Sequence, residues 1–184
     1  MVIACLGWGS LVWNSDTLPL KSTWFENGPF LPIEFARQSA DGRITLVIVN
    51  NGNISLVQSL WAMLDLETID DAIEALRKRE GILIENVIKH IGFWIEGQKP
   101  NDEGITLTIS NWAKQLELNA VIWTNLPPKF ANKNGYVPSM EEVVNYLSSL
   151  EADKLNRAKE YIQKTPQQID TNYRREIKAK LNWA

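Results

Sequence analysis

Cysteine and histidine are nearly absent from this chain of 184 residues, which contains one of each. The single cysteine, Cys5, excludes an intramolecular disulfide, and no Cys-x-x-Cys or Cys/His spacing typical of a metal site is present. We therefore expect neither a bound metal nor a cofactor. Cys5 lies in an apolar run, where a free cysteine usually behaves as a small buried apolar side chain.

Strong charge and long hydrophobic runs are also missing. The formal net charge is -3, and no basic tract is longer than Arg77–Arg79, which argues against the basic face of a nucleic-acid-binding protein. No window approaches the ~20 apolar residues of a membrane-spanning helix. The N-terminus lacks the basic segment and apolar core of a signal peptide. The sequence thus predicts a cytoplasmic protein without a nucleic-acid or membrane partner.

The order of the expected elements indicates an α+β fold. Strands come first, around one helix at residues 69–80, and a helical section follows, which favours a mixed or antiparallel sheet. Asn and Gly at residues 50–53 predict a hairpin between two of the strands. We expect residues 1–130 to form the sheet domain and residues 131–184 a helical C-terminal extension packed on it. The expected strands are residues 1–6, 44–50, 54–66, 87–96, 105–109 and 118–123; the expected C-terminal helices follow Ser139, span about 153–163 and follow Thr165.

A glycine-rich loop, Gly7-Trp8-Gly9-Ser10-Leu11, follows the first strand directly. Its two glycines allow the backbone to turn sharply and to approach a ligand without Cβ obstruction. Successive N–H groups in such a turn form a concave set of donors that suits a carboxylate or phosphate. The loop lacks the third glycine of a dinucleotide fingerprint, and the chain has no Gly-Lys-Ser/Thr phosphate loop. A tight structural turn with Trp8 packed inside explains the loop equally well.

Glu80 occupies a position where the helical pattern calls for an apolar side chain. It lies eleven residues after Ile69 and four after Leu76, so at about 100° per residue it continues the apolar stripe. Glu74, by contrast, should point into solvent. Partial burial and the negative end of the helix dipole both favour a carboxyl that exchanges its proton near neutral pH. Glu80 is therefore a candidate general acid/base, although a solvated or arginine-paired residue in the last turn explains the same pattern.

Three motifs together resemble a known family. Gly7-Trp8-Gly9-Ser10-Leu11-Val12-Trp13 is similar to the Gly-Tyr-Gly-Ser-Leu-Ile-Trp opening of the γ-glutamylcyclotransferases, especially their ChaC branch. Phe35-x-Arg37-x-Ser39-x-Asp41-x-Arg43 resembles that family's segment leading into a strand. Arg79-Glu80-Gly81 resembles its Arg-Glu pair, in which the Glu is catalytic. The motifs occur in the family's order and cover about the first 85 residues.

The resemblance implies a mixed or antiparallel β-barrel with one core helix and an enzyme that cyclises a small γ-glutamyl amide to 5-oxoproline, releasing an amine. It implies Glu80 as the catalytic residue. Gly7, Trp8, Gly9, Ser10 and Leu11 would bind substrate, and Arg37 would contact a substrate carboxylate unless it forms a structural ion pair with Asp41 or another acid. We expect Glu80 and the loop to converge on one cavity. A non-catalytic module that binds a small metabolite or peptide, or a protein that uses its C-terminal helices as an interaction surface, remain alternatives.

Overall fold

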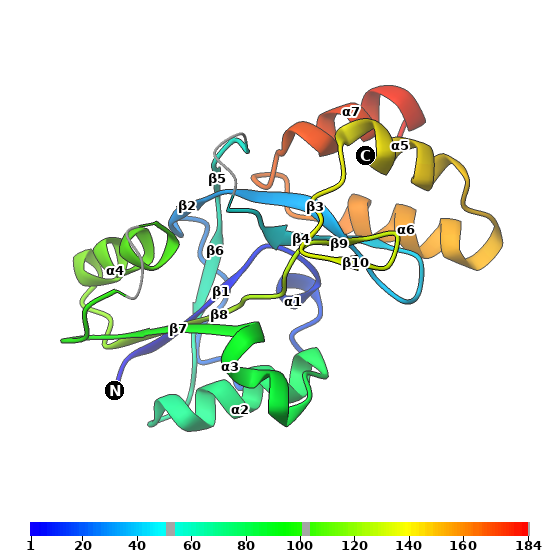
Figure 1. Cartoon of the computed structure of the whole chain (residues 1–184). Helices are drawn as coiled ribbons and strands as arrows, with labels where there is room; N and C mark the ends of the chain where they lie inside the picture. The colour runs from blue at the N-terminus through cyan, green and yellow to red at the C-terminus, as the bar shows by residue number, and fades with distance from the viewer. Residues whose placement is uncertain (51–53, 101–103, 184) are drawn as a thin grey trace. The chain divides into compact units, whose positions relative to one another are not determined.

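The computed structural model describes residues 1–50, 54–100 and 104–183, and it has a mixed α+β architecture (Figure 1). Its contacts divide the chain into two units. Unit 1 contains residues 1–7, 14–31 and 58–126, and unit 2 contains residues 8–13, 32–57 and 127–184. These units do not follow the predicted division between residues 130 and 131.

Unit 1 contains a four-stranded mixed sheet in the order β6-β1-β8-β7. β1 is parallel to β8 and antiparallel to β6, and β7 is antiparallel to β8. Every residue of β1 is buried, as expected for a central strand covered on both faces. The strands are β1 (Ile3–Gly7), β6 (Leu60–Met63), β7 (Ile91–Ile95) and β8 (Ala120–Thr124).

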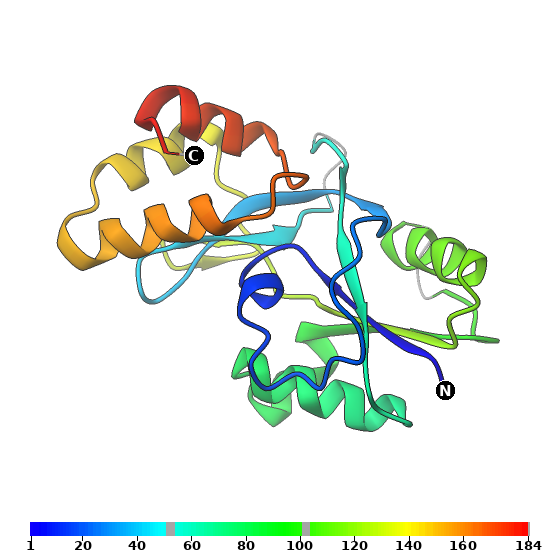
Figure 2. The ribbon, with the colours of Figure 1, turned by 180° about the vertical axis from the view of Figure 1, so that it is seen from behind.

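Helices α2 (Ile69–Glu80) and α4 (Ile105–Gln115) lie on opposite sides of this sheet (Figures 1 and 2). α2 has the predicted boundaries. The side chain of Thr68 accepts a hydrogen bond from the backbone N–H of Asp71, and Gly81 ends the helix in the left-handed conformation, with φ of 64°. A short 3-10 turn, η1 (Ile84–Asn86), and α3 (Val87–His90) then lead into β7.

The prediction of a strand at residues 105–109 is wrong, because these residues begin α4. Their β-branched residues favour a strand locally. In the folded chain, Thr106, Ile109, Ser110 and Ala113 are buried, and this spacing of three, four and seven residues forms one helical face. Packing of this face against the sheet overrides the local preference. Residues 87–90 are likewise helical, so the strand predicted over 87–96 begins only at Ile91.

Unit 2 contains a second four-stranded sheet in the order β10-β9-β3-β4. The predicted hairpin between residues 44–50 and 54–66 is wrong, because β4 pairs with β3; residues 51–53 lie outside the described part of the chain. Asp41 and Gly42, with φ of 92° at the glycine, lie in the turn that joins β3 to β4. The strands are β3 (Ile33–Gln38), β4 (Ile44–Ile48), β9 (Lys129–Phe130) and β10 (Lys133–Asn134); β2 (Phe30–Leu31) and β5 (Val57–Gln58) form a separate two-stranded sheet.

The C-terminal helices of unit 2 pack beside one another (Figures 1 and 2). Ser139 and Glu142 form the predicted capping box at the start of α5. The helix predicted to start at Thr165 begins later, because Thr171 is the residue that caps α7. Unit 2 contains α1 (Ser10–Trp13), α5 (Met140–Ser148), α6 (Ala152–Lys164) and α7 (Asn172–Leu181).

A buried carboxylate links β3 to the start of α7. Glu34 is 1% exposed, and its oxygens accept hydrogen bonds from the hydroxyl of Thr171 and from the backbone N–H groups of Phe35 and Tyr173. The first N–H groups of a helix have no partner within the helix, so a carboxylate placed there satisfies them. Burial nevertheless raises the pKa of Glu34 to about 7, against the opposing effect of these three hydrogen bonds.

The predicted barrel is not observed, whereas the mixed α+β class is. The described strands form three separate sheets, and each four-stranded sheet ends in two edge strands, β6 and β7 in one and β10 and β4 in the other. A closed barrel has no edge strands. Within the described residues, no helix combines the length and apolar character that a membrane crossing requires.

Candidate functional site

The last residue of α2 carries the carboxylate that the sequence singled out. The side chain of Glu80 is 16% exposed, whereas that of Glu74 on the same helix is 46% exposed. Leu76, one turn before Glu80, is fully buried. The apolar periodicity of the helix thus predicted correctly which of the two glutamates is shielded from solvent.

Arg79 holds the Glu80 carboxylate. Its Nη1 lies 2.6 Å from Oε1 of Glu80, and the Arg79 side chain is 11% exposed. Another edge of the same guanidinium donates from Nε and Nη2 to the carbonyl oxygen of Asn14, at 3.2 and 2.6 Å. The rigid guanidinium therefore fixes the position of Glu80 relative to the chain at Asn14. Arg77 takes no part in this pair, since it binds Glu74 and the carbonyl oxygen of Ile82.

The charges of Glu80 and Arg79 act on the thiol of Cys5. Its thiol is fully buried in β1 and lies 3.6 Å from the carbonyl oxygen of Leu6, to which it donates. Burial raises the pKa of Cys5 far above its ordinary value; the negative charge of Glu80 acts in the same direction, and the positive charge of Arg79 opposes it. The thiol is therefore protonated at neutral pH and is not a nucleophile.

The glycine loop is largely buried. Trp8 and Leu11 are 4% and 5% exposed, and the indole N–H of Trp8 donates to the carbonyl oxygen of Leu46 at 3.3 Å. The backbone N–H of Val12 donates to the carbonyl oxygen of Gly9 at 2.9 Å as the chain enters α1. The interpretation of a tight turn with Trp8 packed inside therefore describes this part of the loop in unit 2. Gly7 is the last residue of β1 and pairs with Leu60 in unit 1.

The side chain of Tyr161 fills the space beside Gly9. A Cβ at this position would collide with the hydroxyl of Tyr161, from α6. That hydroxyl also accepts a hydrogen bond from the backbone N–H of Leu46 at 3.3 Å, and the Tyr161 ring packs edge-on against Trp13 at 5.3 Å. Tyr161 is the residue at this loop that sequence reasoning missed. Its helix was predicted, but no local signal connects it to Gly9.

Arg37 does not form the expected ion pair with Asp41. Its Nη1 donates to the carbonyl oxygen of Pro127 at 2.7 Å, and partial burial lowers the pKa of its guanidinium. Asp41 instead pairs with Arg43 at 2.8 Å and accepts from the hydroxyl of Ser39, so these three residues close the turn between β3 and β4. Among the described residues, Arg37 has no ion pair that explains its half-buried charge.

Glu80 belongs to unit 1, whereas Trp8–Leu11 and Arg37 belong to unit 2. Their convergence on one cavity stays a prediction. Gly7 and Asn14, which flank the loop in the sequence, both belong to unit 1 with Glu80. No cluster of three or more cysteine, histidine or acidic residues that could hold a metal ion occurs within residues 1–50, 54–100 and 104–183.

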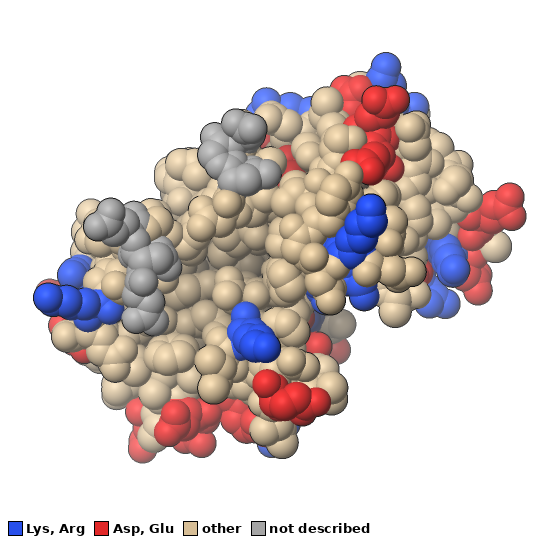
Figure 3. Space-filling model, in the orientation of Figure 1, with Lys and Arg blue, Asp and Glu red and all other residues tan. Residues whose placement is uncertain are grey.

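Figure 3 shows acidic side chains over the start of α2, whose first turn contains Asp70 and Asp71, whereas the last turn of this helix is basic. No protein-family model matches the chain, and no curated protein matches its sequence. An assignment of function therefore depends on the residues themselves.

Proposed function

We propose that this protein is a γ-glutamylcyclotransferase-like enzyme that converts a γ-glutamyl amide into 5-oxoproline and a free amine, with Glu80 as its general acid/base. The observation that carries the proposal is the shielded Glu80 carboxylate at the end of α2, held by Arg79. The resemblance of three motifs, in the family's order, supports the same residue. The finer family fold, a cyclotransferase-like arrangement of the strands, is part of this proposal.

The reaction needs no nucleophile from the protein. The α-amine of the substrate attacks its own γ-carbonyl carbon, a new C–N bond closes the five-membered ring, and the original amide C–N bond breaks. The α-nitrogen loses two protons on going from ammonium to ring amide, and the departing nitrogen gains two and leaves as an ammonium ion. Glu80 carries these protons one after the other, so that the carboxylate is regenerated. The protein contributes proton transfer and a fixed near-attack geometry. The buried, protonated thiol of Cys5 is consistent with a mechanism that has no covalent intermediate.

Arg79 has a positioning role in this mechanism. Because its guanidinium bonds both Glu80 and the carbonyl oxygen of Asn14, it limits the rotation of the carboxylate and holds it beside the residue at which the loop segment ends. We propose that the loop amides and Arg37 bind the charged groups of the substrate, as the family resemblance implies. A half-buried arginine suits a substrate carboxylate, which can accept two parallel hydrogen bonds from it.

The test compares Glu80→Gln with Glu74→Gln, a matched change on the same helix. We expect Glu80→Gln to lower the rate of 5-oxoproline release from γ-glutamyl dipeptides, glutathione or γ-glutamyl amines by ~10² or more. Glu74 is exposed and pairs with Arg77, so Glu74→Gln should leave this rate within about 2-fold of wild type, as is usual for exposed ion pairs. Full activity in a folded Glu80→Gln variant would rule out Glu80 as the base.

A non-catalytic binding module is the second candidate. The observation that favours it is the half-buried guanidinium of Arg37, which forms no ion pair among the described residues and suits an acidic ligand without any catalytic step. In that case the wild-type protein releases no 5-oxoproline from any γ-glutamyl substrate. Titration calorimetry with the same compounds then shows whether the protein binds them.

A further inference from the structure

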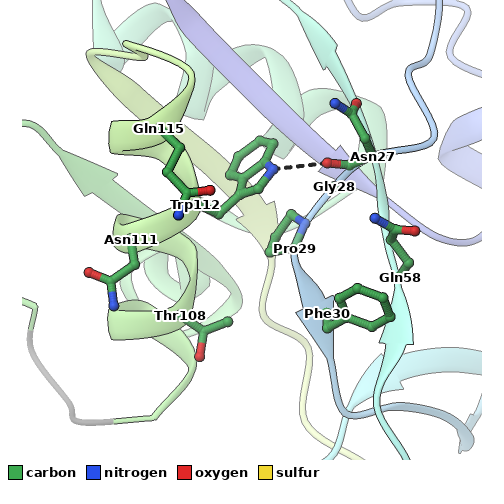
Figure 4. Close-up of a pocket in the computed structure, with 9 residues that line it drawn as sticks. All are labelled: Asn27, Gly28, Pro29, Phe30, Gln58, Thr108, Asn111, Trp112 and Gln115. Atoms are coloured by element: carbon green, nitrogen blue, oxygen red, sulfur yellow. Dashed lines mark hydrogen bonds between the residues drawn. The ribbon is translucent and has the colours of Figure 1, made fainter.

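The sheet of unit 1 ends in two edge strands, β6 and β7. At the β6 edge, the backbone of residues 20–29 runs alongside and supplies hydrogen bonds. Three of its N–H groups donate to carbonyl oxygens at or beside β6, namely Lys21 to Met63, Phe25 to Trp61 and Gly28 to Ser59. The indole N–H of Trp112 in α4 fixes this segment by donating to the carbonyl oxygen of Asn27 at 2.9 Å (Figure 4). The chain itself therefore closes the β6 edge.

At the β7 edge, every second residue turns its backbone groups away from the neighbouring strand β8. The N–H of Asn125 donates to the carbonyl oxygen of His90 at 2.7 Å, and the N–H of Glu96 donates to that of Asn119 at 2.8 Å. Hydrogen-bonded positions alternate in an antiparallel pair, so the even-numbered residues of β7 bond β8 and the odd-numbered ones point to the open edge. The outward-pointing residues are Ile91, Phe93 and Ile95.

Four of these outward-pointing backbone groups have no partner in the chain. The N–H of Ile91 donates to the carbonyl oxygen of Val87 in α3, and the carbonyl oxygen of Ile95 accepts from the N–H of Gln98 at 3.1 Å. The groups that remain are the N–H and C=O of Phe93, the C=O of Ile91 and the N–H of Ile95. None of them is bonded within residues 1–50, 54–100 and 104–183.

This set of free groups is complementary to a second copy of itself. When two β7 strands run antiparallel about a two-fold axis at Phe93, the two Phe93 residues exchange both of their hydrogen bonds. The N–H of Ile95 in each copy then meets the C=O of Ile91 in the other. All four free groups of each copy are used, and the groups already bonded within the chain need no further partner. An interface of this kind is isologous, as in most homodimers.

The side chains of β7 favour such pairing. The strand contains no proline, no charged residue and no bulge, which are the features that usually keep edge strands apart. Phe93 is 40% exposed and would lie directly beside Phe93 of the second copy. Ile84 and Ile88, in the turns before the strand, are 75% and 92% exposed, so the apolar surface continues beyond the strand itself. A partner strand would cover this edge.

The charges at the two ends of β7 agree with the antiparallel direction. Lys89 and His90 precede the strand, and Glu96 follows it. In the register centred on Phe93, His90 of one copy lies opposite Glu96 of the other, and Lys89 lies next to this position. Opposite charges across neighbouring strands stabilise their pairing. A parallel arrangement would instead place like charges side by side.

We propose that this protein forms a homodimer in which the β7 strands of two copies pair antiparallel about Phe93. The two four-stranded sheets then form one sheet of eight strands with β6 at both ends. The dimer explains why the chain covers the β6 edge with residues 20–29 but provides no such cover for β7. It depends on the backbone of unit 1 alone, so it is independent of the proposed cyclotransferase reaction.

The first experiment measures the molar mass of the full-length protein by light scattering after size-exclusion chromatography, from micromolar to hundreds of micromolar concentration. We expect a mass twice the 21.0 kDa of one chain. Phe93→Lys removes the aromatic pair and places two ammonium groups across the two-fold axis, so it should raise the dimer Kd by ~10-fold or more. Met140→Lys changes an apolar residue of similar exposure, 37%, in α5 of unit 2 and should leave the Kd unchanged.

The second experiment locates the interface by amide hydrogen exchange of the wild-type protein. The amides of Phe93 and Ile95 should be protected at concentrations where the dimer forms and should exchange rapidly after dilution to monomer. The amide of Trp94, which belongs to the ladder with β8, is the internal control and should be protected in both states. This measurement needs no variant, so it decides the question even if Phe93→Lys does not fold.

Three outcomes overturn the proposal. The first is a wild-type protein that stays monomeric over the whole concentration range. The second is a dimer that Phe93→Lys and Met140→Lys affect equally. The third is a dimer in which the amides of Phe93 and Ile95 exchange as fast as in the monomer, which would place the interface on another surface. Release of 5-oxoproline enters none of these readouts, so the dimer and the proposed activity fail separately.

Discussion

Glu34→Gln tests the most strongly shifted carboxyl of unit 2. Burial raises the pKa of Glu34 from its ordinary value of 4.5 to about 7, because the side chain is 1% exposed and loses its hydration. The folded state then binds the proton more tightly than the unfolded state. The contribution of Glu34 to stability is full below about pH 4.5, decreases as the pH rises toward 7, and stays constant above that.

The size of this effect follows from the interval between the two pKa values. At about 1.4 kcal/mol per pH unit, the interval from 4.5 to about 7 corresponds to roughly 3 kcal/mol of unfolding free energy. Glutamine has the shape of the protonated side chain and never titrates. The stability of the variant relative to wild type should therefore rise by up to ~3 kcal/mol between about pH 4 and about pH 8.

Urea unfolding followed by tryptophan fluorescence, at several pH values between these two, gives the free energies for both proteins. Only the difference between wild type and variant matters, because all other titrating groups cancel in it. Glu176→Gln, at a partly exposed position of α7, is the matched control and should show no such trend. If Glu34→Gln instead becomes less stable relative to wild type as the pH rises, the hydrogen bonds from Thr171, Phe35 and Tyr173 outweigh burial and the reasoning is refuted.

Two further predictions concern close packing around glycine. Gly9→Ala should destabilise the wild-type protein by about 1–3 kcal/mol because its methyl group collides with the Tyr161 hydroxyl, and by less in a Tyr161→Phe background, where that hydroxyl is gone. A double-mutant cycle by thermal unfolding measures this coupling, and additive effects would contradict the contact. Gly92→Ala places a methyl group against the indole ring of Trp123 and should also cost about 1–3 kcal/mol; an unchanged melting temperature would show that the ring moves aside.

Local signals in the sequence were enough to predict the ends of helices that have clear caps. Thr68, Gly81 and the Ser139 capping box marked ends that the structure reproduces, and the apolar stripe of α2 identified Glu80 as the shielded glutamate. In each case the physical cause lies within a few residues of the effect, so it can be recognised without knowledge of the fold.

The predictions fail where contacts between distant segments of the chain determine the secondary structure or the pairing of strands. Strand 44–48 has a turn signal on each side in the sequence, Asp41-Gly42 before it and an Asn-Gly pair at residues 51–52 after it. The sequence does not show which of the two forms a hairpin. In the structure the strand pairs with β3, across Asp41-Gly42. Packing against the sheet likewise makes residues 105–109 helical. At the candidate site, neither the contact of Tyr161 with Gly9 nor that of Arg79 with Asn14 has a local signature, because the partners are far apart along the chain.

The polypeptide passes between the two units after residues 7, 13, 31, 57 and 126. Neither unit is a continuous stretch, so no single cleavage separates them as autonomous fragments. A chain that ends near residue 130 would retain residues 8–13 and 32–57 but lose the C-terminal helices of the same unit. Either unit could be produced by itself only by joining three separate segments of the chain, because each unit is interrupted twice by the other.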